Sequence, residues 1–315
     1  MFYKQKQNIE LLYGSLSRQS FKDFSVYFVD NNTDEEDRLA SEEVNKRFGL
    51  DIIYLQSAGN TGFAGGNNLG ARRAIDDGCN YIFFLNNDTE LHPNCLEELL
   101  KTANSSPEIG AVAPIIFYGT SAEPEIAIQE YGARANFRSY KISKNFEGQK
   151  LHMVKDSLGH SLEVDLVSGG ACLVKTGVLK KTGLWEESYF AYGDEIDLAR
   201  RIRAEHYKTI VISRAELWHN HKWEKTNKNG YYFEYYLIQR NKYLYFRKYK
   251  LFIPLLVSLL VDEIKFPWRL IWFTKVCDFK LGMCYLRGTI AGVLGHKGAP
   301  PLIKATMAKA PIEND

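Results

Sequence analysis

The sequence lacks the features that mark secreted and membrane-spanning proteins. Its five cysteines are scattered, with no C-x-x-C pair and no histidine at zinc-ligand spacing, so we expect reduced thiols in a cytosolic protein. The N-terminus, MFYKQKQNIE, has no apolar signal-peptide core. The longest apolar run, residues 251–261, is interrupted by Pro254 and is too short for a bilayer about 30 Å thick. We expect this run to be interfacial or buried, and we favour the interfacial position.

Neither sign of charge is in large excess. The formal net charge of the 315 residues is +2, which gives no argument for nucleic acid as the main partner. Hydrophobic side chains make up 45% of the chain and charged ones 25%, a composition typical of a globular protein with one large core or two modest ones. Beyond Arg240, lysine and arginine outnumber the carboxylates.

Continuous apolar runs of strand length stand in the first half of the chain, at residues 25–29 (SVYFV), 51–55 (DIIYL) and 81–85 (YIFFL). Such runs are typical of parallel strands that are buried on both faces. Helical spacing follows the second and third runs, at residues 67–75 and 93–102. The β-α-β-α-β order predicts an α/β domain with its ligand sites at the carboxyl ends of the strands.

The pattern changes further along the chain. From about residue 110 to 175 we expect strands and loops around a polar stretch, 134–160, which is an insertion or a mobile flap. From Tyr231 onward the sequence predicts helices that are dense in aromatic and basic residues. We therefore expect one domain at residues 1–228 and a C-terminal helical region at residues 229–315.

Polar motifs follow the first two apolar runs. Asp30 comes directly after the first run, where a carboxylate can accept the N3–H of a uracil or thymine ring; the alternative is a turn that satisfies its own backbone. The second run leads into a segment rich in glycine and asparagine, residues 59–70. Glycines let the backbone approach a ligand, and the helix N-terminus that follows offers N–H donors to a diphosphate. The spacing matches a dinucleotide fingerprint only loosely, and a structural turn is the alternative.

An oxygen-rich turn follows the third run. Mg²⁺ and Mn²⁺ prefer carboxylate, carbonyl and water ligands, so Asp88 is the main candidate ligand and Asn86 a neutral one. A helix-capping turn is the alternative. His219, after a later apolar segment, is a candidate to complete the metal shell or contact phosphate; a structural imidazole is the alternative.

Three acids lie within four residues after an aromatic run: Asp194, Glu195 and Asp197. The apolar spacing that follows predicts a helix beginning near Asp194. Acids in a first helical turn are favoured by the helix dipole without any function. Beside an aromatic platform for a sugar, one of them is equally a candidate general base.

Taken in order, these motifs resemble family 2 glycosyltransferases, most closely the rhamnosyltransferase-like branch that builds bacterial O-antigen and capsule. The resemblance covers roughly residues 10 to 250 and is carried by VDNNT, GNTGFAGGNNLG, LNNDT, SGGACLVK, YGDEIDLARRIR, LWHNH and YYFEYYLIQRNKYLYFRKY. It implies a GT-A fold, in which a Rossmann-like nucleotide-binding sheet, mixed and mostly parallel, precedes a C-terminal helical membrane-proximal region.

The resemblance also implies roles for individual residues. Asp30 would bind the pyrimidine base, and the nucleotide would be lined by Asn60, Gly62, Phe63, Gly66 and Asn67. Asn86 and Asp88 occupy the metal motif of the family, which takes Mg²⁺ or Mn²⁺. The acidic pair of the family is reversed here, so the base is Glu195 by position or Asp194 by residue type, and Asp197 occupies the place of a further acid.

The implied activity is an inverting transfer of a sugar from a nucleotide-diphosphate donor to a saccharide or lipid-linked saccharide acceptor. dTDP-rhamnose is favoured as donor and UDP-sugars stay open, with the enzyme peripheral at the inner, cytoplasmic face of the cell membrane. Two other classes remain: a nucleotide-sugar-binding or scaffold protein of the same fold without catalysis, and an NAD-dependent α/β enzyme.

Both ends of the sequence carry expectations. The family opens with a hydrophobic strand before its first turn, whereas this sequence starts at Met1-Phe2-Tyr3-Lys4, at about the end of that strand. Loss of this central strand would leave unpaired backbone groups and a hole in the core, so either the true start lies upstream or the sheet is repaired in another way. Near the C-terminus, aromatic and apolar residues amid basic ones favour membrane docking over a helical subdomain or a dimer interface. They are Phe266, Trp268, Leu270, Trp272 and Phe273, with Lys265, Arg269 and Lys275.

Overall fold

The computed structural model describes residues 8–31, 35–123, 126–220, 228–275 and 279–300. They belong to two compact units. The first is drawn from Met1–Phe137, Lys141–Trp185 and Glu195–Lys222, and the second from Arg138–Tyr140, Glu186–Asp194 and Trp223–Asp315. The second unit therefore includes a short internal segment besides the C-terminal residues, and the domain boundary at residue 228 stays a prediction.

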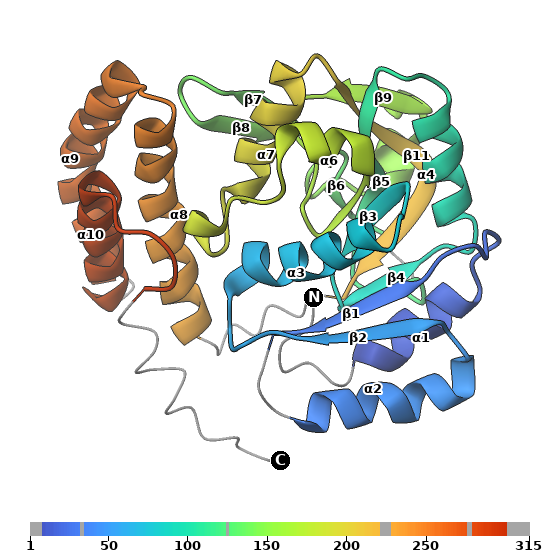
Figure 1. Ribbon diagram of the computed structural model, residues 1–315. Helices are drawn as coiled ribbons and strands as arrows, with labels where there is room; N and C mark the ends of the chain where they lie inside the picture. The colour runs from blue at the N-terminus through green and yellow to red at the C-terminus, as the bar shows by residue number, and fades with distance from the viewer. Residues whose placement is uncertain (1–7, 32–34, 124–125, 221–227, 276–278, 301–315) are drawn as a thin grey trace. The chain divides into compact units, whose positions relative to one another are not determined.

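A mixed β-sheet forms the centre of the first unit (Figure 1). Its main path runs through β3 (Tyr81–Leu85), β10 (Ala171–Lys175), β5 (Ile109–Tyr118), β11 (Lys208–His219) and β4 (Thr89–Leu91). Two short strands pair with it, β6 (Ile128–Glu130) with β5 and β9 (Ser161–Val164) with β11. Separate from this sheet are the parallel pair β1 (Val26–Asp30) and β2 (Ile52–Gln56), and the hairpin of β7 (Ala133–Asn136) and β8 (Lys141–Lys144).

Helices cover both faces of the strands, and two apolar clusters mark these faces. One cluster gathers α1 (Ile9–Ser17), α2 (Glu35–Phe48) and α4 (Cys95–Asn104), and the other α3 (Gly62–Asp76), α6 (Thr176–Thr182) and α7 (Asp194–Ala204). Alternate residues of β3 serve the two clusters: Phe83 and Leu85 face the first, Ile82 and Phe84 the second. This two-sided burial explains why the run YIFFL is apolar throughout.

The structure confirms the α/β class and the three strands, each within one residue of its predicted bounds. The expectation of a mostly parallel sheet is wrong. Among the described strands only β1–β2 and β5–β11 pair in parallel, whereas β10, β4, β6 and β9 pair antiparallel. A continuous apolar run indicates burial on both faces and carries no information on strand direction, so the apolar runs could not predict the antiparallel pairs.

Two further segments add detail to the predictions. The polar stretch 134–160 holds most of the β7–β8 hairpin, α5 (Leu151–Val154) and the short helix η2 (Lys155–Ser157), and its role as an insertion or a mobile flap stays a prediction. The helix predicted from residue 67 begins at Gly62, inside the glycine-rich segment. Gly62 has a φ of 76°, a backbone conformation open to glycine and strained for other residues.

The second unit contains η3 (Glu187–Tyr189), α8 (Lys228–Lys248), α9 (Phe252–Lys275) and α10 (Phe279–Leu294). Arg240 of α8 is almost fully buried and donates to the Tyr189 carbonyl at 2.7 Å, and its burial lowers its pKa to about 10. Asn241 donates to the carbonyls of Ala191 and Tyr192 at 2.7 and 2.6 Å. These two side chains fix the backbone that leads into Asp194.

The apolar run 251–261 forms the first part of α9. Pro254 does not interrupt this helix because it lies in its first turn, where its missing N–H has no intrahelical partner to lose. No helix among the described residues is long and apolar enough to cross a bilayer. The aromatic and basic side chains predicted to dock on a membrane, residues 265–275, lie outside the described side chains.

Candidate active site

Asn31 ties the carboxyl end of β1 to the start of α3. Its Oδ1 accepts hydrogen bonds from the Thr61 N–H at 3.0 Å, the Thr61 hydroxyl at 2.8 Å and the Ser57 hydroxyl at 3.0 Å. Its Nδ2 donates to the Gly62 carbonyl at 3.0 Å. Asn31 is 1% exposed, so this one buried side chain holds the glycine-rich segment against the strand end.

The residues predicted to contact the base and nucleotide lie at the same strand end. Asp30 is fully buried, and its carboxylate accepts from the Tyr54 hydroxyl at 2.7 Å. The Asn60 side chain accepts from the Gly62 N–H at 3.0 Å, and Asn67 Nδ2 donates to the Phe63 carbonyl at 2.9 Å. Gly66 lies buried in the first turns of α3.

Asp88 and His219 face each other where β4 and β11 pair. The Asp88 Oδ1 and the His219 Nε2 are 3.0 Å apart, and Asp88 is only 5% exposed. The other ring nitrogen, Nδ1, lies 3.0 Å from Gln129 Nε2 and 3.1 Å from Gln129 Oε1. With the proton on Nε2, the ring donates to Asp88 and Nδ1 accepts from the Gln129 amide. With the proton on Nδ1, the ring donates to Gln129 Oε1 and Nε2 presents its lone pair toward Asp88.

This geometry fits a divalent cation. Two neighbouring ligands about 2.1 Å from an octahedral cation are about 3 Å apart, close to the observed separation of Asp88 and His219. The described residues hold no cluster of three or more His, Cys, Asp or Glu side chains that could bind a metal. A cation here would therefore complete its shell with neutral oxygens, such as that of Asn86, with water, or with the phosphates of a ligand.

The segment Ser168-Gly169-Gly170 brings the motifs together. A methyl group on Gly169 would lie 3.0 Å from the Phe63 ring and 3.1 Å from Glu195 Cγ. One on Gly170 would lie 2.7 Å from the Asn86 side chain. Only residues without a side chain permit such approaches. The glycine-rich segment, the oxygen-rich turn and the acidic helix thus converge on two adjacent glycines.

The three acids of α7 have different surroundings. Asp197 is fully buried and pairs with Arg201 at 2.8 Å, and the same guanidinium donates to the carbonyls that follow α6. Its observed contacts are therefore structural. Asp194 is fully buried as the first residue of α7, whereas Glu195 stays partly exposed.

Glu130 is a further acid near Glu195. It ends β6, and the Ser168 backbone donates a hydrogen bond to it. Burial of its carboxyl group, together with the negative charge of Glu195, raises the pKa of Glu130 to about 7 although Lys144 and Ser168 oppose the shift. Near neutral pH this carboxyl group is therefore part protonated.

The structure places the predicted residues in two groups. Phe63, Asn86 and Glu195 meet around Gly169 and Gly170, and Asp88 meets His219. Asp194 belongs to the second unit, so its relation to these residues stays a prediction. Asn31, Gln129 and Glu130 are not among the residues predicted from the sequence. Asn31 lies inside the motif VDNNT, whereas Gln129 and Glu130 lie in a strand without any motif.

Two family descriptions and a curated relative match long parts of the chain. Residues 1–158 match the family described as Glycosyl transferase family 2, and residues 81–295 match Glycosyl transferase family group 2. A curated relative, the low-salt glycan biosynthesis hexosyltransferase Agl10 of Haloferax volcanii, is 28% identical over 250 residues, which cover 77% of this chain and 72% of the relative.

Two solved structures share the fold. One is the mannosyltransferase PcManGT from Pyrobaculum calidifontis in complex with GDP-Man and Mn2+, with a TM-score of 0.55 at 13% identity. The match spans 93% of this chain and 85% of that one. GalNAc-T7 with UDP, GalNAc and Mn2+ has a TM-score of 0.58 at 14% identity, and the match spans 75% of this chain but only 44% of that one. These likenesses show a GT-A-like fold.

Proposed function

The chain belongs to glycosyl transferase family 2, and from this premise we propose that it transfers a hexose from a nucleotide-diphosphate donor to a saccharide acceptor with inversion at the anomeric carbon. The observation that carries the proposal is the convergence of Phe63, Asn86 and Glu195 on Gly169 and Gly170. In such a transfer, the donor site, the diphosphate site and the base must lie about the width of one sugar ring apart. In this proposal they are formed by the glycine-rich segment, the oxygen-rich turn and the acidic helix.

Glu195 is the base in this proposal. It keeps partial exposure and lies against Gly169, whereas Asp194 is fully buried and Asp197 is engaged by Arg201. Glu195 removes the proton of an acceptor hydroxyl, whose oxygen attacks the anomeric carbon from the face opposite the diphosphate. A single displacement of this kind inverts the configuration.

Asp88 and His219 hold the divalent cation, Mg²⁺ or Mn²⁺, with Asn86 as a neutral neighbour. When bound, the cation supplies Lewis-acid stabilisation of the departing diphosphate. Gln129 contacts the His219 ring at Nδ1, and with the proton on Nδ1 the Nε2 lone pair is available as a ligand. The Mn2+ in both solved neighbours supports this choice.

The donor is proposed more finely as dTDP-rhamnose, with UDP-sugars as the alternative, and the acceptor as a saccharide of a cell-surface polysaccharide such as O-antigen or capsule. This rests on the resemblance of the motifs. A pyrimidine nucleotide agrees with Asp30 at the strand end, although its carboxylate already accepts from Tyr54. The relative from Haloferax volcanii is named for glycan biosynthesis, which supports a glycan acceptor.

A lipid-linked acceptor and peripheral association at the inner face of the cell membrane complete the proposal. The supporting observation is an exposed apolar face on α9, at Ile253, Leu256, Leu260 and Ile264. Their spacing of three to four residues places them along one side of the helix. Lys280 and Arg287 are exposed on α10, beside which α9 packs, and suit an anionic lipid surface.

The test measures sugar transfer and donor hydrolysis with Mn²⁺ across dTDP- and UDP-sugars, for the wild type, Asp88→Asn and Glu195→Gln. We expect Glu195→Gln to lose at least roughly a hundredfold in kcat while it still binds donor, because only the base is removed. Asp88→Asn should lose metal-dependent donor binding as well. Glu97→Gln, an exposed acid in the first turn of α4, is the matched control and should stay fully active. Full activity of both site variants, with and without chelator, would refute the mechanism.

A further inference from the structure

Residues 182–185 connect the end of α6 to the point where the chain leaves the first unit. Trp185 is the last residue of that unit before Glu186–Asp194, which belong to the second unit, and Glu195 is the first residue after them. Trp185 and Glu195 line the same small cavity of about 20 Å³, together with Leu198 of α7. The chain therefore leaves and re-enters the first unit at neighbouring points, one of which is the proposed base.

Asn68 holds this loop from the side of α3. Its Nδ2 donates to the Trp185 carbonyl at 2.9 Å, and its Oδ1 accepts from the Trp185 N–H at 3.0 Å. One planar amide thus satisfies both backbone groups of Trp185. Asn68 is buried, so water competes little for either hydrogen bond. The position of the Trp185 backbone is therefore fixed relative to α3.

Arg201 holds the same loop from the side of α7. Its guanidinium donates to the carbonyls of Thr182, Gly183 and Leu184 at 2.6, 3.0 and 2.8 Å. Its Nε donates to the buried Asp197 at 2.8 Å, which fixes the direction of the guanidinium plane. Only arginine presents so many donors in a rigid planar arrangement. The loop is therefore fixed relative to α7 as well.

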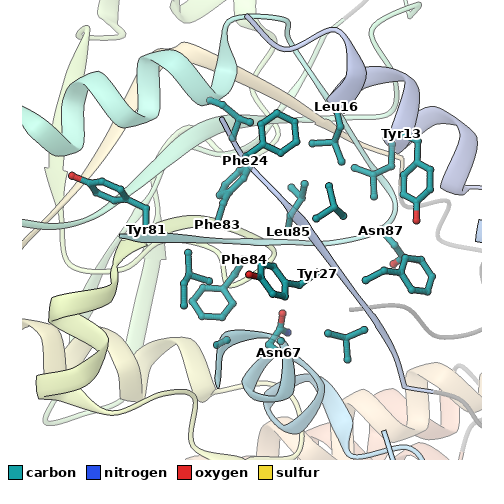
Figure 2. A pocket seen from close by; sticks show the side chains of 18 residues that line it. Tyr13, Leu16, Phe24, Tyr27, Asn67, Tyr81, Phe83, Phe84, Leu85 and Asn87 are labelled. Atoms are coloured by element: carbon teal, nitrogen blue, oxygen red, sulfur yellow. The ribbon is translucent and has the colours of Figure 1, made fainter. Parts of the chain in front are cut away.

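The ring of Trp185 lies between the two sides of the proposed site. It packs edge-to-face against Phe63 of α3, with the ring centroids 5.5 Å apart, and against Phe84 of β3 at 5.1 Å. Figure 2 shows Phe84 on the same side of β3 as Asn67, at a larger cavity that is lined by β1 and β3. Trp185 thus contacts Phe63 on the nucleotide side and shares the small cavity with Glu195 on the base side.

We propose that Asn68 and Arg201 are positioning residues for Glu195. They hold residues 182–185 between α3 and α7, and this loop sets the separation between the base and the nucleotide side of the site. Neither residue touches the substrate. The inference rests on the proposed function, in which Glu195 is the base, and it adds two residues that act on the reaction only through the position of that base.

The experiment measures kcat and the donor KM with Mn²⁺ and the most active of the dTDP- and UDP-sugars. Asn68→Ala removes both hydrogen bonds to Trp185, and Arg201→Lys keeps a cation for Asp197 but loses the planar fork. We expect each variant to lower kcat at least roughly tenfold and to change the donor KM less than about threefold, because a misplaced base slows the reaction while the donor contacts remain. In the Glu195→Gln background each should lower the residual kcat less than about twofold, since no base is left to misplace.

Hydrogen–deuterium exchange gives a second readout that needs no sugar transfer. In both variants exchange should become at least roughly tenfold faster in residues 182–185 and also in residues 198–202 of α7, and it should stay unchanged in α4. The effect of Asn68→Ala on α7 is the decisive one. Asn68 lies on α3, and in this proposal it reaches α7 only through the loop.

Two matched substitutions lie away from the loop. Arg73→Lys affects an arginine of α3 that also pairs with an acid four residues away, Asp77 at 2.9 Å. Asn104→Ala affects an exposed asparagine at the end of α4, which accepts from the Tyr81 hydroxyl at 2.6 Å. Both controls should keep the wild-type kcat and the wild-type exchange in α7.

Three results would overturn the positioning role. One is an unchanged kcat in both Asn68→Ala and Arg201→Lys. Another is an equal fold loss in the wild type and in Glu195→Gln, which would show that the two residues do not act through the base. The last is unchanged exchange of α7 in Asn68→Ala. Full activity of Glu195→Gln would instead refute the base that the proposed function assigns, so the two failures are distinguishable.

Discussion

Glu130 and Glu195 place two carboxyl groups close enough for their charges to interact beside Ser168. The folded protein resists ionisation of Glu130 because its carboxyl group is buried and the charge of Glu195 is nearby. An ordinary glutamate in the unfolded chain ionises near pH 4.3. Between that pH and about 7 the folded state therefore holds more protons than the unfolded state, and stability is lost as pH rises.

Glu130→Gln should remove this loss. Glutamine keeps the shape of protonated glutamic acid and cannot ionise, so the variant should be about as stable as the wild type at pH 4. At pH 8 it should be more stable by on the order of 2 kcal/mol. Urea unfolding at the two pH values measures the difference. A difference between the two proteins that is the same at both pH values would contradict the buried, raised-pKa carboxyl group.

At the residue scale the sequence supported some assignments better than others. Asp88 and His219 were proposed as metal ligands from separate motifs, and the structure brings them to 3.0 Å of each other. Gln129 and Glu130 were not foreseen, because polar residues in a short strand carry no pattern. Asp197 was predicted as a site residue, but it pairs with Arg201. The sequence of a helix start does not distinguish an acid that faces a substrate from one that forms an ion pair within the protein.

The loop Ser168–Gly170, between β9 and β10, is the element on which the site depends. Gly170→Ala should push the Asn86 side chain aside, since the added methyl would approach its Nδ2 to 2.7 Å. A displacement of this size next to the proposed diphosphate site should lower kcat/KM by roughly 10- to 100-fold. The free energy of unfolding should change by less than about 2 kcal/mol, because a side-chain tip can move.

Gly177→Ala is the matched control in α6. Nothing lies within 4 Å of the added methyl, and alanine favours a helix over glycine by about 0.5–1 kcal/mol. This variant should keep full activity and gain stability. Steady-state kinetics measure kcat/KM of both variants, and denaturant unfolding measures their stability. An unchanged kcat/KM in Gly170→Ala would show that Asn86 is not part of the site.

At the element scale the strands were predictable and the sheet was not. Apolar runs located β1, β2 and β3 within a residue, since both of their faces are buried. The pairing of β10 between β3 and β5 depends on contacts between segments far apart in sequence, which no local pattern encodes. The start of α3 at Gly62 was missed because glycine and asparagine disfavour helices, and Asn31 supplies the missing stabilisation from a distant strand.

At the scale of the whole molecule, the proposed membrane association rests on the exposed apolar face of α9 in the second unit. Ile253→Gln, Leu256→Gln and Leu260→Gln together remove three exposed apolar side chains from α9. Co-sedimentation with vesicles rich in phosphatidylglycerol should weaken at least roughly tenfold, since binding scales with buried apolar area. Leu39→Gln, an equally exposed leucine on α2 of the first unit, should leave binding unchanged. Equal binding by the triple variant and the wild type would disprove docking through α9.

The family could be recognised from the order of motifs, and the comparisons confirm it. The division into two units could be foreseen only in outline. Residues 186–194 join the second unit because Arg240 and Asn241 hold their backbone, a long-range interaction that composition does not reveal. The first unit holds an apolar cavity of about 190 Å³ that is lined by β1 and β3.

That cavity has a consequence for the response of the molecule to hydrostatic pressure. The volume of a folded chain includes any empty space between its atoms. Unfolding eliminates this space and lowers the volume, so compression favours the unfolded state. The apolar space between β1 and β3 lies in the first unit, so we expect pressure to destabilise this unit. Larger side chains that fill the space would reduce the effect. The volume change of unfolding is thus a direct gauge of how well the centre of this enzyme is packed.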